Sequence, residues 1–198
     1  SEQIKLPHTL LEQSSSDPPE VIGASFSADI INREKQCILT VREYITSFVT
    51  AMIVKDETHI SLRDGLIQLA VPLIPLGGPP AVIRCDPAPG FLRLEDDPIL
   101  TKHNISIETG RRKNVNKNPI AERAIQELEE EICKIEPGGG PINPTILAIA
   151  TTNLNAKLRS RGVSSREMLY QRDQFTHNQI PISDLELILK QQETTLVL

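Results

Sequence analysis

Apolar side chains alternate with smaller or polar ones near the start of the region that begins at residue 21. They recur at every second position: Ile22, Ala24, Phe26, Ala28 and Ile30. This is the period of a strand with one buried face, and it places Asp29 on the opposite face from Phe26. Two more runs, 36–41 and 47–54, are rich in β-branched and apolar residues. The three segments together predict an antiparallel meander.

A set of leucines at helical spacing follows the meander. They are Leu62, Leu66, Leu69 and Leu73. Asp56 or Thr58 can cap the first turn of this helix, and the Gly-Gly-Pro-Pro sequence at 77–80 is expected to end it. Short apolar runs at 81–85 and 104–108 then predict a fourth and a fifth strand.

Two Asn-Pro pairs mark the expected starts of the next two helices. The pairs are Asn118-Pro119 and Asn143-Pro144, and a Pro-Gly-Gly-Gly-Pro breaker at 137–141 lies between them. An asparagine side chain can accept an orphan amide proton, and proline is tolerated at the first helical position. The order of strands and helices predicts an α/β fold with a five-stranded mixed sheet flanked by helices.

The length of 198 residues allows one substantial core. The polar segment 1–20 is expected to be a leader or linker, 21–175 the folded core, and 176–198 a C-terminal tail. Capping-box patterns at Ser164 and Ser183, each followed by glutamate three residues later, predict a short helix near the end of the core and another in the tail.

Composition limits the classes of function. The net charge of −5 gives no overall basic field, so affinity for nucleic acid must come from local patches. Three widely spaced cysteines indicate neither a disulfide framework nor a zinc module, and a reducing compartment follows as the simpler assumption. No apolar run is long enough for a membrane helix, and no targeting signal is visible. These features predict a soluble intracellular protein, nuclear or cytoplasmic, with no membrane partner.

Three acidic residues occupy positions suited to a two-metal phosphoryl-transfer site. Asp29 lies in the first strand, Asp86 directly follows the fourth, and Glu122 lies in the first turn of a helix. Fifty-six residues separate the first two, and thirty-five separate Asp86 from Glu122. Among 26 acidic residues some trio has any chosen spacing by chance, so the spacing alone decides little. The placement on strand, strand end and helix favours a metal site.

These residues and several neighbouring segments resemble the catalytic core of retroviral and LTR-retrotransposon integrases, a DDE-type family. The resemblance includes the sequence Ile-Arg-Cys-Asp at 83–86, the second and third strands, and the segment 164–172, whose Glu-Met-Leu-Tyr-Gln-Arg is similar to a Glu-Leu-Leu-Tyr-Gly-Arg run near the end of the family core. It covers roughly residues 21–172 in the right order. It implies the ribonuclease H-like fold.

The resemblance also implies an activity. The chain would be a metal-dependent polynucleotidyl transferase, an integrase that trims the 3′ ends of element DNA and joins them to target DNA. Two Mg²⁺ or Mn²⁺ ions would be held by Asp29, Asp86 and Glu122. Asp29 and Asp86 would share one ion, and either of them would share the other with Glu122. DNA and further copies of the chain, as a dimer or higher homo-oligomer, would be its partners.

Basic and amide side chains gather just before the helix that carries Glu122. The candidates for DNA contact are Arg111, Arg112, Lys113, Asn116, Lys117 and Asn118. The alternative interpretation of this segment is an ordinary solvated loop. Positions farther along the helix are often basic in the family but are Gln126 and Glu129 here. The run of glutamates at 127 and 129–131 is interpreted as an exposed helix face.

A second functional hypothesis remains open. The turn after Asp86 reads Pro-Ala-Pro-Gly-Phe where the family usually has Asn-Gly, and its two prolines remove amide donors. Together with the acidic balance, this change fits a domesticated or inactive integrase-derived domain that binds nucleic acid or protein. The retained carboxylate trio favours the enzyme.

Overall fold

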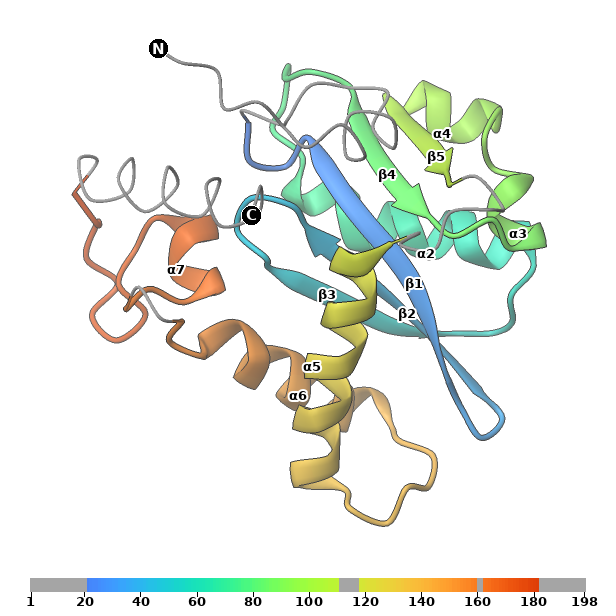
Figure 1. The fold of residues 1–198 in the computed structure, drawn as a ribbon. Helices are drawn as coiled ribbons and strands as arrows, with labels where there is room; N and C mark the ends of the chain where they lie inside the picture. Colours follow the sequence, from blue (N-terminus) through green and yellow to red (C-terminus); the bar gives the residue numbers. More distant parts are fainter. Residues whose placement is uncertain (1–20, 111–117, 160–161, 182–198) are drawn as a thin grey trace.

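A five-stranded mixed sheet forms the centre of the molecule (Figure 1). The computed structural model describes residues 21–110, 118–159 and 162–181. The strand order is β3-β2-β1-β4-β5. In chain order the strands are β1 (Ser25–Arg33), β2 (Gln36–Glu43), β3 (Val49–Val54), β4 (Ala81–Cys85) and β5 (Ile105–Thr109). The predicted α/β architecture and the five predicted strands are confirmed, with boundaries that shift by a few residues.

The first three strands form the predicted antiparallel meander, and β1 is the central strand. It pairs antiparallel with β2 and parallel with β4, which in turn pairs parallel with β5. Two parallel strands cannot be joined by a tight hairpin. The helical segment between β3 and β4 provides the first crossover, and the two short helices between β4 and β5 provide the second.

Helices cover both faces of the sheet (Figure 1). In chain order they are α2 (His59–Ala70), η1 (Val71–Leu73), α3 (Pro89–Leu92), α4 (Pro98–Lys102), α5 (Pro119–Ile135), α6 (Pro144–Ala156) and α7 (Ser165–Tyr170). One apolar cluster, which includes Phe26, Ala28 and Leu66, joins α2 to the sheet. A second, which includes Ile31, Ile38 and Leu128, joins α5 and α6 to the other face. Phe26 and Asp29 therefore face opposite sides, as predicted.

Helix α2 begins as predicted but ends earlier. The Thr58 side chain accepts a hydrogen bond from the Ser61 backbone N–H and caps the first turn. The helix was expected to continue through Leu73 to the turn at 77–80, and this is wrong. It ends at Ala70 and gives way to a 3-10 turn that contains Pro72. Proline supplies no backbone N–H and its ring clashes with the preceding helical turn, which explains the early end.

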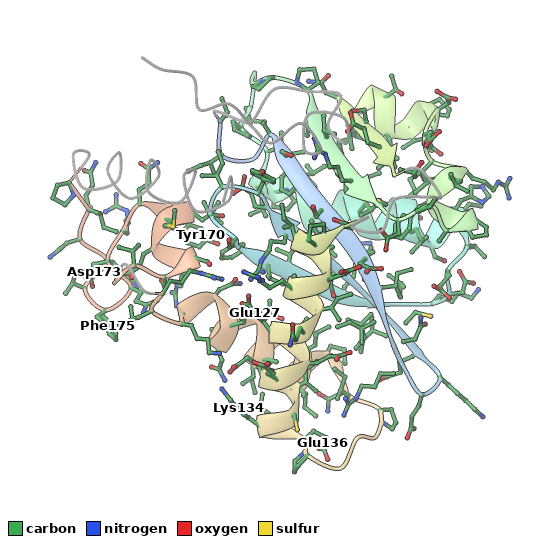
Figure 2. The ribbon with its side chains drawn as sticks, viewed as in Figure 1. Glu127, Lys134, Glu136, Tyr170, Asp173 and Phe175 are labelled. Atoms are coloured by element: carbon green, nitrogen blue, oxygen red, sulfur yellow. The ribbon has the colours of Figure 1, made fainter. Side chains whose placement is uncertain are left out.

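Two glutamates on α5 attach this helix to its surroundings. Glu127, labelled midway along α5 in Figure 2, forms an ion pair with Arg42 of β2. Glu131 is buried and pairs with Lys134 and with Lys157, which follows α6. The expectation that this run of glutamates is an exposed face is therefore wrong for these two residues. It holds for Glu129 and Glu130, which are exposed.

The C-terminal part of the described chain contains one of the two predicted capping boxes. Ser164 and Glu167 cap α7 reciprocally. The second predicted box, at Ser183, lies outside the described residues, as does the predicted leader 1–20; the predicted tail 176–198 is described only to residue 181. All three cysteines are free thiols. Among the described residues, no helix combines the length and the apolar character that a membrane span requires.

Candidate functional site

Asp29 and Asp86 occupy matched positions on two neighbouring parallel strands. In the register of β1 and β4 the last pair is Ala28 with Cys85, and each aspartate is the next residue along its chain. Neighbouring strands lie about 4.8 Å apart. Ala28 and Cys85 belong to the cluster under α2, so alternation turns both aspartates toward the face that α5 covers. The strands therefore bring the first two predicted site residues side by side.

Glu122 approaches from the helix above that face. It lies in the first turn of α5, where its side chain is exposed. Burial is the largest cause that raises the pKa of Asp29, to about 6, and a hydrogen bond from the Ile30 backbone N–H to its Oδ1 at 2.7 Å opposes the rise. The negative charges of Asp86 and Glu122 raise this pKa further. The three predicted carboxylates thus lie within electrostatic range of one another.

A fourth acidic residue, Glu57, adds to the same negative field. Its charge also raises the pKa of Asp29. Glu57 lies in the connection between β3 and α2, one residue before the Thr58 cap. Nothing in the local sequence distinguishes this glutamate from any other in a loop, and only the packing of the loop places its charge near β1.

The donor set suits a hard divalent cation. Carboxylate oxygens are the ligands that Mg²⁺ prefers, and a cation would relieve the repulsion that raises the pKa of Asp29. Asp29, Asp86 and Glu122 are the residues that could hold such an ion. In residues 21–110, 118–159 and 162–181, however, no three His, Cys, Asp or Glu side chains are grouped closely enough to form a ready metal site.

The side chain of Asn118 does not make the contacts expected of a helix cap or a DNA-binding residue. Helix α5 begins after Asn118 as predicted, but the Asn118 side chain makes no capping hydrogen bond, so that part of the prediction is wrong. It is buried, and its amide group donates to the backbone carbonyls of Ala28 at 3.2 Å and Arg84 at 3.3 Å. These bonds use the NH₂ group of the side chain, whereas a helix cap would use its oxygen as the acceptor of a backbone N–H. The amide group faces the sheet and is not presented to solvent.

The other predicted DNA contacts lie outside the described residues. These are Arg111, Arg112, Lys113, Asn116 and Lys117. In the sequence they lie between β5 and α5, and the first residue of α5, Pro119, is three residues before Glu122. Their assignment to DNA remains a prediction.

The proline-rich turn after Asp86 leads directly into a short helix. Pro89 occupies the first turn of α3, where its missing N–H costs nothing. The next residue, Gly90, packs tightly: a Cβ there would lie 2.4 Å from the Glu57 carbonyl oxygen and 2.8 Å from Leu62 Cδ1. The turn that follows Asp86 and the loop that carries Glu57 are therefore in direct contact.

Two solved structures with a similar fold are retroviral integrase catalytic cores. The catalytic core domain of BIV integrase in crystal form I matches with a TM-score of 0.53 and 18% identity, over 88% of this chain and 99% of that one. The HTLV-2 integrase catalytic core domain in complex with magnesium, in a trimeric form, matches with a TM-score of 0.59 and 18% identity, over 76% and 98%. The chain has the fold of an integrase catalytic core. The predicted ribonuclease H-like fold is thereby confirmed. No protein-family model and no curated protein matches the sequence.

Proposed function

We propose that this chain is a metal-dependent polynucleotidyl transferase of the integrase type. The observation that carries the proposal is the placement of Asp29 and Asp86 side by side at the end of a parallel strand pair, with the charge of Glu122 acting on the same carboxylate. The integrase-core fold supports this assignment, because the HTLV-2 relative with that fold was solved in complex with magnesium.

Two Mg²⁺ or Mn²⁺ ions fit the chemistry proposed for this site. When bound, such ions activate the attacking oxygen and stabilise the leaving oxygen of a phosphodiester. The task of the protein is to present oxygen ligands and to orient them. Asp29 is fixed by the Ile30 N–H and by its place in the central strand, and we assign it one ion together with Asp86. Glu122 would hold the second ion together with one of the two aspartates.

The proposed substrates are the ends of an element DNA and a target DNA. Arg111, Arg112, Lys113 and Lys117 provide the densest group of positive charges near Glu122 in the sequence, and Asn116 adds a hydrogen-bonding amide. Point charges of this kind contact phosphates and position a duplex without reading its sequence. Asn118 is not included, because its amide group is engaged by two strand carbonyls. A homo-oligomer is proposed, in line with the trimeric form of the HTLV-2 core.

The test is disintegration of a branched DNA that mimics the joined product. This reaction reverses strand joining and does not require the native end sequence to be known. The unmodified chain is expected to resolve the branch with Mn²⁺ or Mg²⁺ and not with EDTA. Asp86→Asn and Glu122→Gln each remove a metal ligand and are expected to lower the rate by at least about 100-fold. Glu129→Gln is the matched control, since it makes the same change at an exposed position on the same helix.

The second candidate is an inactive integrase-derived domain that binds nucleic acid or protein. Two observations favour it: no ready metal group exists among the described residues, and the turn after Asp86 is stiffened by Pro87 and Pro89. This candidate predicts no product from the branched DNA with either metal. Metal-independent binding of the same DNA, at equal affinity in Asp86→Asn, is the positive result that would select it over the enzyme.

A further inference from the structure

Asn118 connects the three chain segments that carry the candidate carboxylates. Its side-chain amide donates to the carbonyl of Ala28, the residue before Asp29, and to the carbonyl of Arg84, two residues before Asp86. Its own backbone carbonyl accepts a hydrogen bond from the Glu122 N–H at 3.0 Å. A single residue therefore bonds to β1, to β4 and to the first turn of α5.

The chemistry of an asparagine side chain suits this position. Its NH₂ group has two donors, which match two carbonyl acceptors on different strands. Aspartate offers no donor, and alanine offers no polar group. Both donors are needed, because Asn118 is almost fully buried and no water replaces a missing partner without cost.

The chain contains a matched residue with an ordinary role. Asn143 also precedes a proline and begins a helix, yet its side chain accepts a hydrogen bond from the Ile146 backbone N–H and remains exposed. The two asparagines thus share their local sequence but not their partners. The difference arises because Asn118 lies over the junction of β1 and β4.

We propose that Asn118 is a positioning residue that fixes the first turn of α5, and hence Glu122, over Asp29 and Asp86. The other attachments of α5 are the buried Ala121 in its first turn and two contacts farther along the helix. The second apolar cluster includes Ala124 and Leu128, and Glu127 makes the ion pair with Arg42. The inference rests on the proposed function for its importance to metal binding. The hydrogen bonds by which Asn118 attaches the helix to the two strands do not depend on the proposed function.

The first measurement is amide hydrogen exchange without metal. In Asn118→Ala and Asn118→Asp, exchange of the Glu122 amide is expected to accelerate by at least about tenfold, because the first turn loses its side-chain hydrogen bonds to β1 and β4. In Asn143→Ala, the Glu122 amide is expected to exchange at the unmodified rate, although this variant also loses stability through its missing cap. Unchanged Glu122 exchange in both Asn118 variants would overturn the proposal.

The second measurement is the binding of Mn²⁺ alone, at a temperature well below the unfolding temperature. Binding is monitored by the loss of the electron paramagnetic resonance signal of the free ion. Loss of a group that orients metal ligands typically lowers affinity by about 10–100-fold. Asn118→Ala is expected to weaken Mn²⁺ binding by at least that lower factor, whereas Asn143→Ala and Asn143→Asp keep the unmodified affinity. Equal weakening in the Asn143 variants would assign the effect to general loss of stability and overturn the proposal.

The two measurements separate the two claims. If the unmodified chain binds no Mn²⁺, the proposed function fails, and the exchange of the Glu122 amide alone decides whether Asn118 fixes the helix. If Asn118→Asp does not fold, Asn118→Ala supplies the same comparison without adding a buried charge.

Discussion

Arg42 and Glu127 form a two-point ion pair between β2 and α5. The Nη1 and Nη2 atoms of Arg42 donate to the two carboxylate oxygens of Glu127 at 3.3 and 3.0 Å, and its Nε donates to the Ser47 carbonyl at 2.9 Å. Arg42 is only 3% exposed. A guanidinium in such surroundings depends on its anion, so this pair attaches the helix that carries Glu122 to the meander.

Replacing Glu127 is therefore expected to destabilise the fold. Glu127→Gln leaves a buried guanidinium without its counter-charge and is expected to lower the free energy of unfolding by about 1–3 kcal/mol. Glu129→Gln on the exposed side of the same helix is expected to change it by less than about 0.5 kcal/mol. Urea unfolding of both variants makes the comparison. Equal stabilities would mean that the pair contributes nothing net.

The same pair predicts a loss of stability in acid. Burial would raise the pKa of Glu127, but hydrogen bonds and charge from Arg42, together with Arg159 and Lys157, outweigh it and hold this pKa below its usual value. A carboxyl group whose pKa is lower in the folded state than in the unfolded state stabilises the fold at pH values above its unfolded-state pKa. This stabilisation is lost as the pH falls through the folded-state pKa. The difference in stability between the unmodified chain and Glu127→Gln is therefore expected to shrink below about pH 4.

The raised pKa of Asp29 predicts the opposite pH dependence of stability. Its raised pKa of about 6, caused first by burial and then by neighbouring charges, means that the folded state favours the protonated carboxyl. That stabilisation is complete below the unfolded-state pKa and is lost as pH rises through 6. Without metal at pH 8, Asp29→Asn is expected to be more stable than the unmodified chain by about 1 kcal/mol, a value discounted for the partial exposure of the side chain.

Thermal unfolding of Asp29→Asn at pH 4 and pH 8 tests this sign. Asparagine retains the Oδ1 acceptor for the Ile30 N–H, so the substitution changes mainly the charge. The stabilising effect should be largest at pH 8 and nearly absent at pH 4. A variant that is less stable than the unmodified chain at pH 8 would contradict the electrostatic description of the site.

Gly90 is expected to tolerate no side chain. A Cβ at this position would lie within 2.4 Å of a backbone oxygen, so Gly90→Ala must displace either α3 or the loop that carries Glu57. Overpacking of this kind costs about 1–3 kcal/mol. Gly140→Ala is the matched control, because a Cβ there meets no atom within 4 Å. A smaller loss of stability in Gly90→Ala than in Gly140→Ala would show that the contact is easily relieved.

The basic segment before α5 predicts a salt-dependent interaction with DNA. Neutralising Arg111, Arg112, Lys113 and Lys117 together is expected to weaken duplex binding and to flatten its salt dependence, by about 0.9 in the log–log slope for each phosphate that the variant no longer neutralises. The double variant Lys35→Gln/Lys102→Gln removes exposed charges elsewhere as a control. Because a net charge of −5 weakens binding to DNA, the variants are compared at low ionic strength. An unchanged slope would show that another surface of the molecule contacts DNA.

The sequence contained most of the information about the sheet and the carboxylates. Period-two alternation around Phe26 determined which face of β1 Asp29 occupies, because one face of that strand must be buried. Asp86 was assigned to the same site from the resemblance to integrase cores, and the parallel register of β1 and β4 places it beside Asp29. Helix starts were also local: Thr58 and Ser164 cap their helices as their sequences predict. The face of β1 and the two helix starts were predictable because each depends on a few neighbouring residues.

The unpredicted features all depend on partners distant in sequence. Asn118 and Asn143 have the same local pattern, and only the strands beneath Asn118 determine its different role. Glu127 is an acidic helix residue like Glu129 until the fold brings Arg42 against it. The charge of Glu57 acts on Asp29 because the loop between β3 and α2 passes near β1. Tertiary contacts select among side-chain roles that the local sequence leaves equivalent.

The metal site is tested most directly by a Mn²⁺ titration of thermal stability, with the unmodified chain, Asp86→Asn and Glu129→Gln side by side. An ion that binds only the folded state raises the unfolding temperature as its concentration exceeds the dissociation constant. The unmodified chain and Glu129→Gln are expected to show a saturable rise at millimolar Mn²⁺, and Asp86→Asn is expected to show none. No rise in the unmodified chain, or an equal rise in Asp86→Asn, would contradict a metal site built from Asp29, Asp86 and Glu122.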